Sequence, residues 1–263
     1  MSVHSDRGRA ESFGAVAELY ERARPSYPPA LVDALLEGGV HDVLDVGTGT
    51  GIAGGLLAAR GCAVLGVEVD ERMAARARAR GLDVDVAPFE RWQPAGQRAF
   101  DLVIAAQAWH WIDPAAGVRR AAGMLRPRGR LAVFWNLGDP PAHVRTVLDP
   151  IYDRLEPALG HGTQNTGAPR RQAADSAVEG IAGSGCFEAP TIRRFPWSRS
   201  YDAESWVALL ATHSDHQTLP PPRREALLDA IGTALGGLGE SFEMPYETVL
   251  VEARLAGDRR PMI

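Results

Sequence analysis

The chain has 263 residues, 45% of them hydrophobic, and a formal net charge of −5. This length and apolar content are enough to bury a full core, and the negative charge offers no broad electrostatic attraction to nucleic acid. All 28 basic residues are arginines, which excludes a P-loop lysine, a pyridoxal Schiff base and a lysine general base. No apolar run is long enough for a membrane span, so we expect a cytoplasmic protein with no membrane partner.

Two helices are predicted before the first strand. Residues 10–24 carry apolar side chains at helical spacing, and the prolines of RPSYPP end that helix. Residues 30–37 are predicted to form the second helix. The pair either packs on a sheet or covers a ligand cleft, in which case Tyr20 and Tyr27 point inward. We treat residues 1–40 as an N-terminal helical cover.

The stretch VLDVGTGTG, residues 43–51, combines a short apolar run, one acid and alternate glycines. It predicts a buried strand at residues 43–46 that enters a tight turn, where glycine lets the backbone approach a ligand closely. Residues 52–60 are predicted to be helical, and a helix N-terminus presents unpaired N–H groups. Strand, turn and helix together indicate an anion- or nucleotide-binding corner.

Two chemistries use such a corner. From Gly49 onward, GTGIAG fits the dinucleotide pattern G-x-G-x-x-G, and the acidic Glu68 lies 19 residues further on. In that motif the first glycine follows the strand directly, whereas here Asp45 lies in the strand end and Gly47 precedes the pattern. An acid at this place suits a ligand that carries an ammonium and a sulfonium, and it is awkward beside a pyrophosphate.

Strands and helices alternate along the next stretch of the chain. Strands are predicted at residues 63–68, 84–87, 100–106 and 130–135, and helices at residues 71–80 and 114–125. Short apolar strands separated by single helices indicate an α/β fold with a doubly wound, mostly parallel sheet, whose ligands bind at the carboxyl ends of the strands. We assign residues 41–138 to this binding core.

Residues 139–184 break that rhythm. Helical runs at 144–159 and 172–182 flank a loop rich in glycine, asparagine and threonine, and we interpret the segment as an inserted helical lid. Residues 185–263 are predicted to return to the core, with strands at 187–197 and 242–254 and helices at 203–212 and 222–235. Cys62 and Cys186 lack metal-ligand spacing, so both are expected to be buried apolar side chains and no metal site is predicted.

Polar and aromatic side chains gather in AAQAWHWID, residues 105–113, after a predicted strand end. His110 is the first candidate for a general base, and Gln107 is a candidate cofactor contact. Trp109 and Trp111, which flank the histidine, are candidate substrate contacts. His213, in the segment THSDHQ, is the second candidate base.

These motifs resemble those of a known family. LDVGTGTG is similar to motif I of the class I S-adenosylmethionine-dependent methyltransferases. YERARPSYP, AQAWHW and LRPRGRLAVFWN resemble segments of a small-molecule group that includes trans-aconitate methyltransferases. The resemblance covers residues 13–136 and, more loosely, PYETVLVEAR near the end. It implies a Rossmann-like methyltransferase fold of seven strands with a final antiparallel strand, and S-adenosyl-L-methionine as the cofactor.

The resemblance also implies roles for individual residues. Glu68 would accept the ribose hydroxyls, and Val69 would pack beside the adenine. Many relatives have an aspartate after the third strand, where this chain has APFE, so the backbone near Phe89 and Glu90 is expected to hold the adenine. Gln107 would contact the sulfonium end. The methionine part and the sulfonium would lie against Tyr20, Asp45, Gly47, Thr48, Gly49 and Gly51.

The predicted function is transfer of the methyl group of S-adenosylmethionine to a small-molecule acceptor, in bacterial secondary metabolism, by a monomer or homodimer. A hydroxyl or amine acceptor needs a general base, whereas a carboxylate needs only groups that hold it. Three alternatives remain open: an RNA or protein methyltransferase, a nicotinamide-dependent oxidoreductase, and a cofactor-binding protein without turnover.

Overall fold

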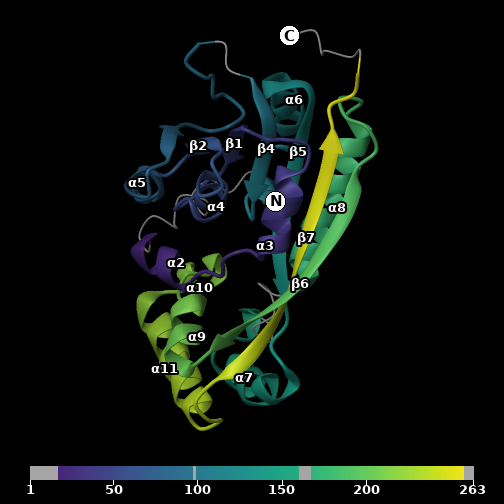
Figure 1. Ribbon diagram of the computed structural model, residues 1–263. Coiled ribbons are helices and arrows are strands. Elements are labelled where there is room, and N and C mark those ends of the chain that lie inside the picture. Colours follow the sequence, from purple (N-terminus) through teal and green to yellow (C-terminus); the bar gives the residue numbers. More distant parts are fainter. Residues whose placement is uncertain (1–16, 97–98, 160–166, 258–263) are drawn as a thin grey trace.

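The computed structural model describes residues 17–96, 99–159 and 167–257 (Figure 1). Its sheet has seven strands in the order β3-β2-β1-β4-β5-β7-β6. Strands β1 to β5 pair in parallel, and β7 runs antiparallel to both β5 and β6. The strands are β1 (Asp42–Val46), β2 (Ala63–Glu68), β3 (Asp83–Val86), β4 (Phe100–Ala106), β5 (Leu125–Gly138), β6 (Thr191–Tyr201) and β7 (Phe242–Arg254). The predicted mostly parallel sheet with an antiparallel strand is confirmed.

Crossover helices join parallel strands, as the sequence predicts: α4 (Ile52–Ala58), α5 (Glu71–Ala79) and α6 (Pro114–Met124). Helix α3 (Pro29–Leu36) precedes β1. Local capping fixes where two of them begin. The Asp70 carboxylate accepts the backbone N–H of Arg72 at the start of α5, and Asp113 caps α6 with Pro114 in its first turn.

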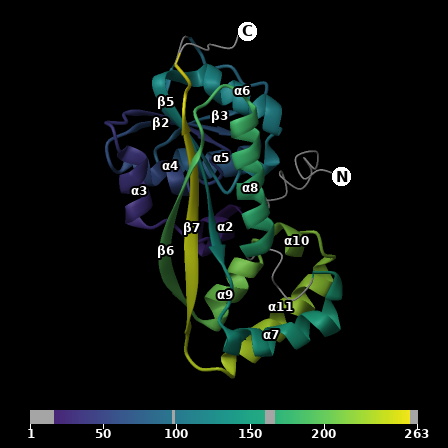
Figure 2. The same cartoon turned by 90° about the vertical axis from the view of Figure 1, so that its right-hand side faces the viewer.

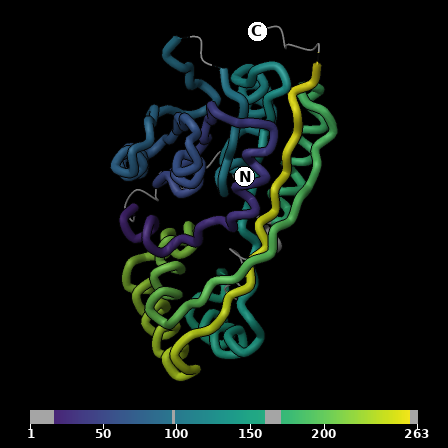
Figure 3. Tube along the Cα trace, viewed as in Figure 1, coloured from purple at the N-terminus to yellow at the C-terminus, as the bar shows by residue number. Residues whose placement is uncertain are grey.

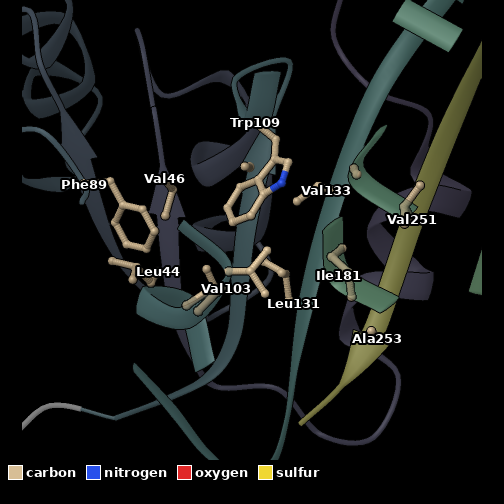
Figure 4. Close-up of a cluster of buried hydrophobic side chains, with 14 of the residues drawn as sticks. Leu44, Val46, Phe89, Val103, Trp109, Leu131, Val133, Ile181, Val251 and Ala253 are labelled. Carbon is tan, nitrogen blue, oxygen red and sulfur yellow. The ribbon is translucent and has the colours of Figure 1, made fainter. Parts of the chain in front are cut away.

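Apolar side chains cover both faces of the sheet. On one face, Leu44, Val46, Val103, Leu131 and Val133 pack with Trp109 and Ile181 (Figure 4). On the other face, Leu31 and Leu35 of α3 pack against Phe134 and its neighbours. The two buried cysteines lie in these clusters, as predicted. Because both faces are covered, polar ligands are left with the carboxyl edge of the sheet.

The last three strands of the sheet extend well beyond the others and carry a second group of helices (Figure 1). These are α7 (Ala142–Leu155), α9 (Ala203–Leu210), α10 (Ser214–Gln217) and α11 (Pro221–Gly236), which we call the helical cap. A separate apolar cluster holds α7, α9 and α11 together, with Tyr152, Trp206 and Ile231 among its buried members. The cap therefore has a core of its own at the carboxyl end of the sheet.

The lid predicted over residues 139–184 needs correction. Its first helix, α7, belongs to the helical cap, but its second, α8 (Gly167–Gly183), packs along β5 and β7 (Figure 2). Ala174, Ala177 and Ile181 of α8 are buried in the sheet core because this helix covers, beside α6, the same face of the sheet over β5 and β7. Residues 160–166 of the predicted loop lie outside the described residues.

Strand β6 begins four residues later than predicted, because Phe187 forms only an isolated bridge with Leu255, and it continues to Tyr201 by pairing with the start of β7. Strand β5 likewise extends past the predicted residues 130–135 in both directions. Within the described ranges, no helix is both long and apolar enough to cross a membrane.

Helix α2 (Ala17–Ala23) lies between the parallel half of the sheet and the helical cap (Figure 3). Its Glu21 accepts hydrogen bonds from Arg76 and Arg80 of α5, at 2.7 and 2.8 Å. Arg24, just after the helix, donates from Nη2 to the carbonyl of Thr212 at 2.8 Å. These contacts tie the cap to the nucleotide-binding corner through α2. Residues 10–16 of the predicted first helix lie outside the described residues.

A buried arginine makes a first prediction possible. Arg130 in β5 is 6% exposed and donates to Glu252 of β7, to the carbonyl of Leu35 in α3 and to that of Glu37 just after α3. We expect Arg130→Met to lower the free energy of unfolding by about 3 kcal/mol. The substitution leaves two carbonyls without their donor and a largely buried carboxylate with the more distant Arg193, 3.6 Å away. Urea denaturation measures this change.

The matched control is Arg194→Met, which removes an exposed pair between Arg194 and Glu247 on the neighbouring strands. It should cost less than about 1 kcal/mol. Equal losses for the two variants would contradict the structural role of Arg130.

Candidate active site

The glycine turn after β1 is held by the carboxylate of Glu68 at the end of β2. Oε2 of Glu68 accepts the backbone N–H of Gly49 at 2.8 Å, and Oε1 accepts those of Val69 and Asp70 at 2.8 and 3.1 Å. Burial raises the pKa of Glu68, and the three N–H groups oppose that rise. Oε2 keeps capacity for a further donor, since a carboxylate oxygen can accept two hydrogen bonds.

Asp45 supports the same turn from behind. It is fully buried, and its Oδ2 accepts from the hydroxyl of Thr48 at 2.7 Å and from the N–H of Gly54 at 3.1 Å. Burial raises its pKa to about 6 against these two hydrogen bonds. Asp45 therefore positions Thr48 and the start of α4, and it is absent from the cavity lining described next.

An open cavity lies at the carboxyl edge of the sheet. Its floor is the turn from Gly47 to Thr50, with Ala106 and Gln107 at the end of β4. The first turn of α4 contributes Ile52 and Ala53. The remaining lining residues come from α2 and the segment after it, the helical cap and the extended strands: Tyr20, Arg24, Pro25, Tyr27, Gly138, Trp206, Leu209, Leu210, His213, Met244 and Tyr246.

The turn needs glycine where it meets the cavity floor. Gly47 and Gly49 adopt φ angles of 66° and 57°, which L side chains rarely adopt. A Cβ atom on Gly47 would lie 2.5 Å from the Cβ of Ala108. Glycine is therefore required at both positions for the backbone conformation, and at Gly47 also for packing against Ala108.

Gln107 is held in a strained conformation at the cavity wall. Its φ of 59° is unusual for a residue with a side chain, and its N–H donates to the carbonyl of Phe134 at 2.9 Å. The side-chain Oε1 is buried and has no hydrogen-bond partner among the described residues. A buried acceptor of this kind is costly unless a ligand satisfies it. The prediction that Gln107 faces the ligand site agrees with this geometry.

Tyr20 and Tyr27 both line the cavity, as the helical-cover hypothesis requires. The guanidinium of Arg24 lies 4.7 Å from the ring centroid of Tyr20. Tyr27 packs edge-on against Phe134, with ring centroids 4.9 Å apart. The cover thus contributes aromatic walls and one cation.

Several predicted contacts lie elsewhere in the structure. Trp109 and Phe89 are 4% and 2% exposed, and both side chains pack in the core beneath the sheet (Figure 4). The prediction that Trp109 contacts substrate is wrong for this reason, and only the backbone of Phe89 remains available to an adenine. Glu90 accepts the N–H of Asp113 at 3.1 Å and holds the loop before α6. Val69 is 38% exposed beside the turn, outside the cavity lining.

The two candidate bases have different surroundings. His110 accepts a hydrogen bond at Nδ1 from the indole of Trp135 at 3.3 Å and packs against Trp111, and neither residue lines the cavity. His213, at the start of α10, does line it and is 8% exposed. The structure therefore favours the second candidate over the first.

Other lining residues escaped the sequence analysis. Arg24 lies in the YERARPSYP segment, which drew attention only through its tyrosines. Trp206, Leu209 and Leu210 sit at the helical spacing of any amphipathic helix, and Gly138, Met244 and Tyr246 sit on long strands. No local motif marks these residues, because their place at the cavity depends on how the cap folds back over the sheet.

The fold and this site together define a class I S-adenosylmethionine-dependent methyltransferase. A family model described as a methyltransferase domain matches residues 44–133. An uncharacterized methyltransferase of Mycobacterium tuberculosis is 31% identical over 258 residues, which cover 96% of this chain and 99% of the relative. The chain belongs to the methyltransferase family, and its cofactor is S-adenosyl-L-methionine.

Further relatives and solved structures agree with this assignment. The chain is 27% identical, over 70% of its length and 83% of the relative, to a ubiquinone biosynthesis O-methyltransferase of Bordetella parapertussis. Its fold is similar to that of a Haemonchus contortus phosphoethanolamine N-methyltransferase solved with S-adenosylhomocysteine, with a TM-score of 0.50 and 14% identity over 92% of this chain and 57% of that one. A proposed type II methyltransferase of Anaeromyxobacter dehalogenans gives a TM-score of 0.56 at 24% identity, over 88% and 97% of the two chains.

The raised pKa of Asp45 predicts a pH dependence of stability. The folded protein holds this proton more tightly than the unfolded chain, whose carboxyl has the ordinary value of 3.8. The contribution of Asp45 to the free energy of unfolding is therefore fully present below pH 3.8 and is lost as the pH rises to about 6. The loss amounts to about 3 kcal/mol, because one pKa unit corresponds to about 1.4 kcal/mol.

Urea denaturation of the wild type and Asp45→Asn across this pH range measures the effect. The wild-type stability should fall relative to that of the variant as the pH rises, and the two curves should run parallel above pH 6. Asp33→Asn, at an exposed acid of α3, serves as the control and should parallel the wild type. If the curves of Asp45→Asn and the wild type ran parallel over the whole pH range, the raised pKa of Asp45 would be contradicted.

Proposed function

We propose that this protein transfers the methyl group of S-adenosylmethionine to a small-molecule acceptor bound in the same cavity. The observation that carries this proposal is Gln107, a strained residue that places an unsatisfied buried acceptor at the cavity wall beside the glycine turn. Strain and unsatisfied polar atoms persist where a ligand completes the site. The acceptor and the cofactor sulfonium would meet next to this side chain.

The lining supports a place for each part of the cofactor. In this proposal the glycine turn receives the ribose side. Glu68 lies outside the cavity lining and holds that turn through the N–H of Gly49. Arg24 supplies a guanidinium whose Nε is buried without a hydrogen-bond partner in the described part of the chain, and it suits the carboxylate of the methionine part. No aspartate or glutamate occurs among the described lining residues, so Arg24 keeps its charge for a ligand.

The side of the cavity proposed for the acceptor is apolar. Trp206, Leu209 and Leu210 of α9 line it together with Met244 and Tyr246 of β7. Such a lining suits a small organic molecule. The Bordetella parapertussis relative, an O-methyltransferase of ubiquinone biosynthesis, supports a small-molecule acceptor with an oxygen nucleophile.

Methyl transfer to such an acceptor is an in-line displacement, which the protein promotes by alignment. The acceptor atom attacks the methyl carbon, the bond from carbon to sulfur breaks, and the electron pair leaves with sulfur. Holding nucleophile, methyl and sulfur in line can contribute about 7–11 kcal/mol to lowering the barrier. The cap also excludes water from the reacting atoms.

Calorimetric titration with S-adenosylhomocysteine and, separately, with NAD tests the cofactor side. We expect binding of S-adenosylhomocysteine alone. Glu68→Ala should weaken that binding about 10–100-fold, because it removes a charged hydrogen-bond acceptor and the support of Gly49.

Glu71→Ala is the matched control, because Glu71 is an exposed acid on α5 whose loss should leave the dissociation constant unchanged. Circular dichroism establishes that both variants are folded. An unchanged dissociation constant for folded Glu68→Ala, or binding of NAD alone, would overturn the proposed site.

A further inference from the structure

Four polar side chains form a buried group in the helical cap behind the cavity wall. His213, Asp215 and His216 come from α10 and the residue before it, and Tyr152 comes from α7. Their exposed fractions are 8%, 6%, 2% and 0%. Burying so many polar groups in an apolar cluster is costly, so their arrangement calls for a functional reason.

Hydrogen bonds fix the state of His216. Its Nδ1 lies 2.8 Å from Oδ1 of Asp215, and its Nε2 lies 2.9 Å from the hydroxyl of Tyr152. Burial raises the pKa of Tyr152, so this phenol stays protonated and donates to Nε2. His216 is then a neutral ring with its proton on Nδ1, and it donates that proton to Asp215.

Asp215 remains ionised in this setting. Burial alone would raise its pKa, but the hydrogen bond from His216 lowers it below the ordinary value. A carboxylate oxygen of Asp215 lies within 4.8 Å of a ring nitrogen of His213. A buried carboxylate at this distance stabilises the imidazolium that forms when the ring of His213 accepts a proton.

His213 is the member of this group that lines the cavity, and it shares that cavity with Gln107 and the glycine turn. Trp206, which is 4% exposed, also lines it with an indole N–H that has no hydrogen-bond partner among the described residues. A residue that can accept a proton and an indole N–H donor thus line the same cavity. That combination suits an acceptor oxygen that loses a proton as it attacks.

We propose that His213 is the catalytic base for an aromatic hydroxyl acceptor. Asp215, held by His216 and Tyr152, positions the ring of His213 and stabilises its protonated form. The inference rests on the proposed function. The acceptor O–H gives its proton to the ring of His213, the oxygen forms the bond to the methyl carbon, and the sulfonium leaves as a neutral thioether. His213 is then an imidazolium beside the carboxylate of Asp215.

The chemistry of the base selects the acceptor class. An ordinary imidazole has a pKa of about 6.5, a phenol of about 10, and water, like an aliphatic alcohol, near 16. The proton transfer is therefore uphill by about 3.5 units for a phenol and by about 9 units for an aliphatic alcohol. Trp206 and Tyr246, which stacks on Trp197 at 4.8 Å, give the wall an aromatic character that matches a phenol.

A bound metal ion is the competing use of the same residues. One ligand atom each from His213, Asp215 and His216 lies within 4.8 Å of the others. Zinc ligands must approach to about 2.0–2.1 Å of the ion, and both ring nitrogens of His216 are already hydrogen-bonded to Asp215 and Tyr152. Metal binding would have to break one of these bonds, which favours the role in proton transfer.

The charged and titratable groups around His213 predict the direction of a pH effect. Asp215 and His216 face it from α10, Tyr152 lies behind them on α7, and Arg24 approaches from α2 through its bond to the Thr212 carbonyl. Asp215 favours protonation of His213, and Arg24 opposes it. Removing the charge of Asp215 should therefore move the titration of His213 to lower pH.

The test uses 2-naphthol and 2-naphthoic acid as matched probes, with methyl-labelled S-adenosylmethionine and the wild-type enzyme. We expect transfer to the naphthol and none to the acid. His213→Gln should lower kcat about 10²–10⁴-fold, while the dissociation constant of S-adenosylhomocysteine stays within about twofold of wild type. His143→Gln, at an exposed histidine of α7, is the control and should retain wild-type turnover.

Asp215→Asn tests the positioning role. It should lower kcat with little change in KM and move the rising limb of the pH profile of kcat/KM to lower pH, which a merely structural residue would not do. Transfer to the acid alone, or to neither probe while S-adenosylhomocysteine still binds, would overturn the inference without touching the proposed function. Failure to bind S-adenosylhomocysteine would instead overturn the function itself.

Two measurements on the wild-type protein test the proposal without any variant. In wild-type protein labelled with ¹⁵N-histidine and saturated with S-adenosylhomocysteine, the ring of His213 should titrate while that of His216 stays neutral with its proton on Nδ1. A His216 ring that titrates in place of His213 would overturn the proposal. Loss of turnover with EDTA and recovery with Zn²⁺ would assign the residues to a metal instead.

Discussion

The bond from the N–H of Gly49 to the carboxylate of Glu68 joins the ends of the neighbouring strands β1 and β2 at the proposed cofactor site. Glu68 is buried and Gly49 is half-buried, so separating the turn from the strand end would cost a hydrogen bond to a buried carboxylate. Asp45 fixes the other side of the turn through Thr48 and Gly54. The shape of the cavity floor depends on these two acids.

The rest of the cavity is assembled from segments far apart in the chain. The long strands β5, β6 and β7 carry the helical cap beyond the sheet, and α2 joins cap and sheet through Glu21 and Arg24 (Figure 1). Two walls of different chemistry result. The sheet side offers backbone and hydrogen-bonding groups to a cofactor, whereas the cap side offers apolar and aromatic surface with His213. Such a division allows one family to keep its cofactor and change its acceptor.

The sheet, its order of elements and the floor of the cavity were predictable from sequence, because each depends on local patterns. Few other folds are compatible with alternate glycines, an acid at the end of β2 and short apolar strands. The cap was not predictable in the same way. Helix α8 belongs to a segment that is predicted to form a lid, but it covers the sheet. Trp109 belongs to a polar and aromatic motif that predicts a substrate contact, but its side chain fills the core. Whether a side chain faces a cavity or a core depends on tertiary packing, which periodicity does not record.

Tertiary packing also explains why the structure favours His213 over His110 as the candidate base. His110 lies in a motif and His213 does not, yet His213 reaches the cavity because α10 follows α9 back toward the sheet. The buried carboxylate two residues further on gave no sign in the sequence that it would be enclosed.

We propose that one cavity, lined by the glycine turn, α2 and the cap, binds the cofactor. Hydrogen–deuterium exchange with and without S-adenosylhomocysteine tests this most directly. We expect slower exchange at residues 47–50, at Gln107, in α2 and in α9 to α10, with no change in α8. Protection in α8 instead, or protection of the glycine turn without any in α2 and the cap, would contradict it.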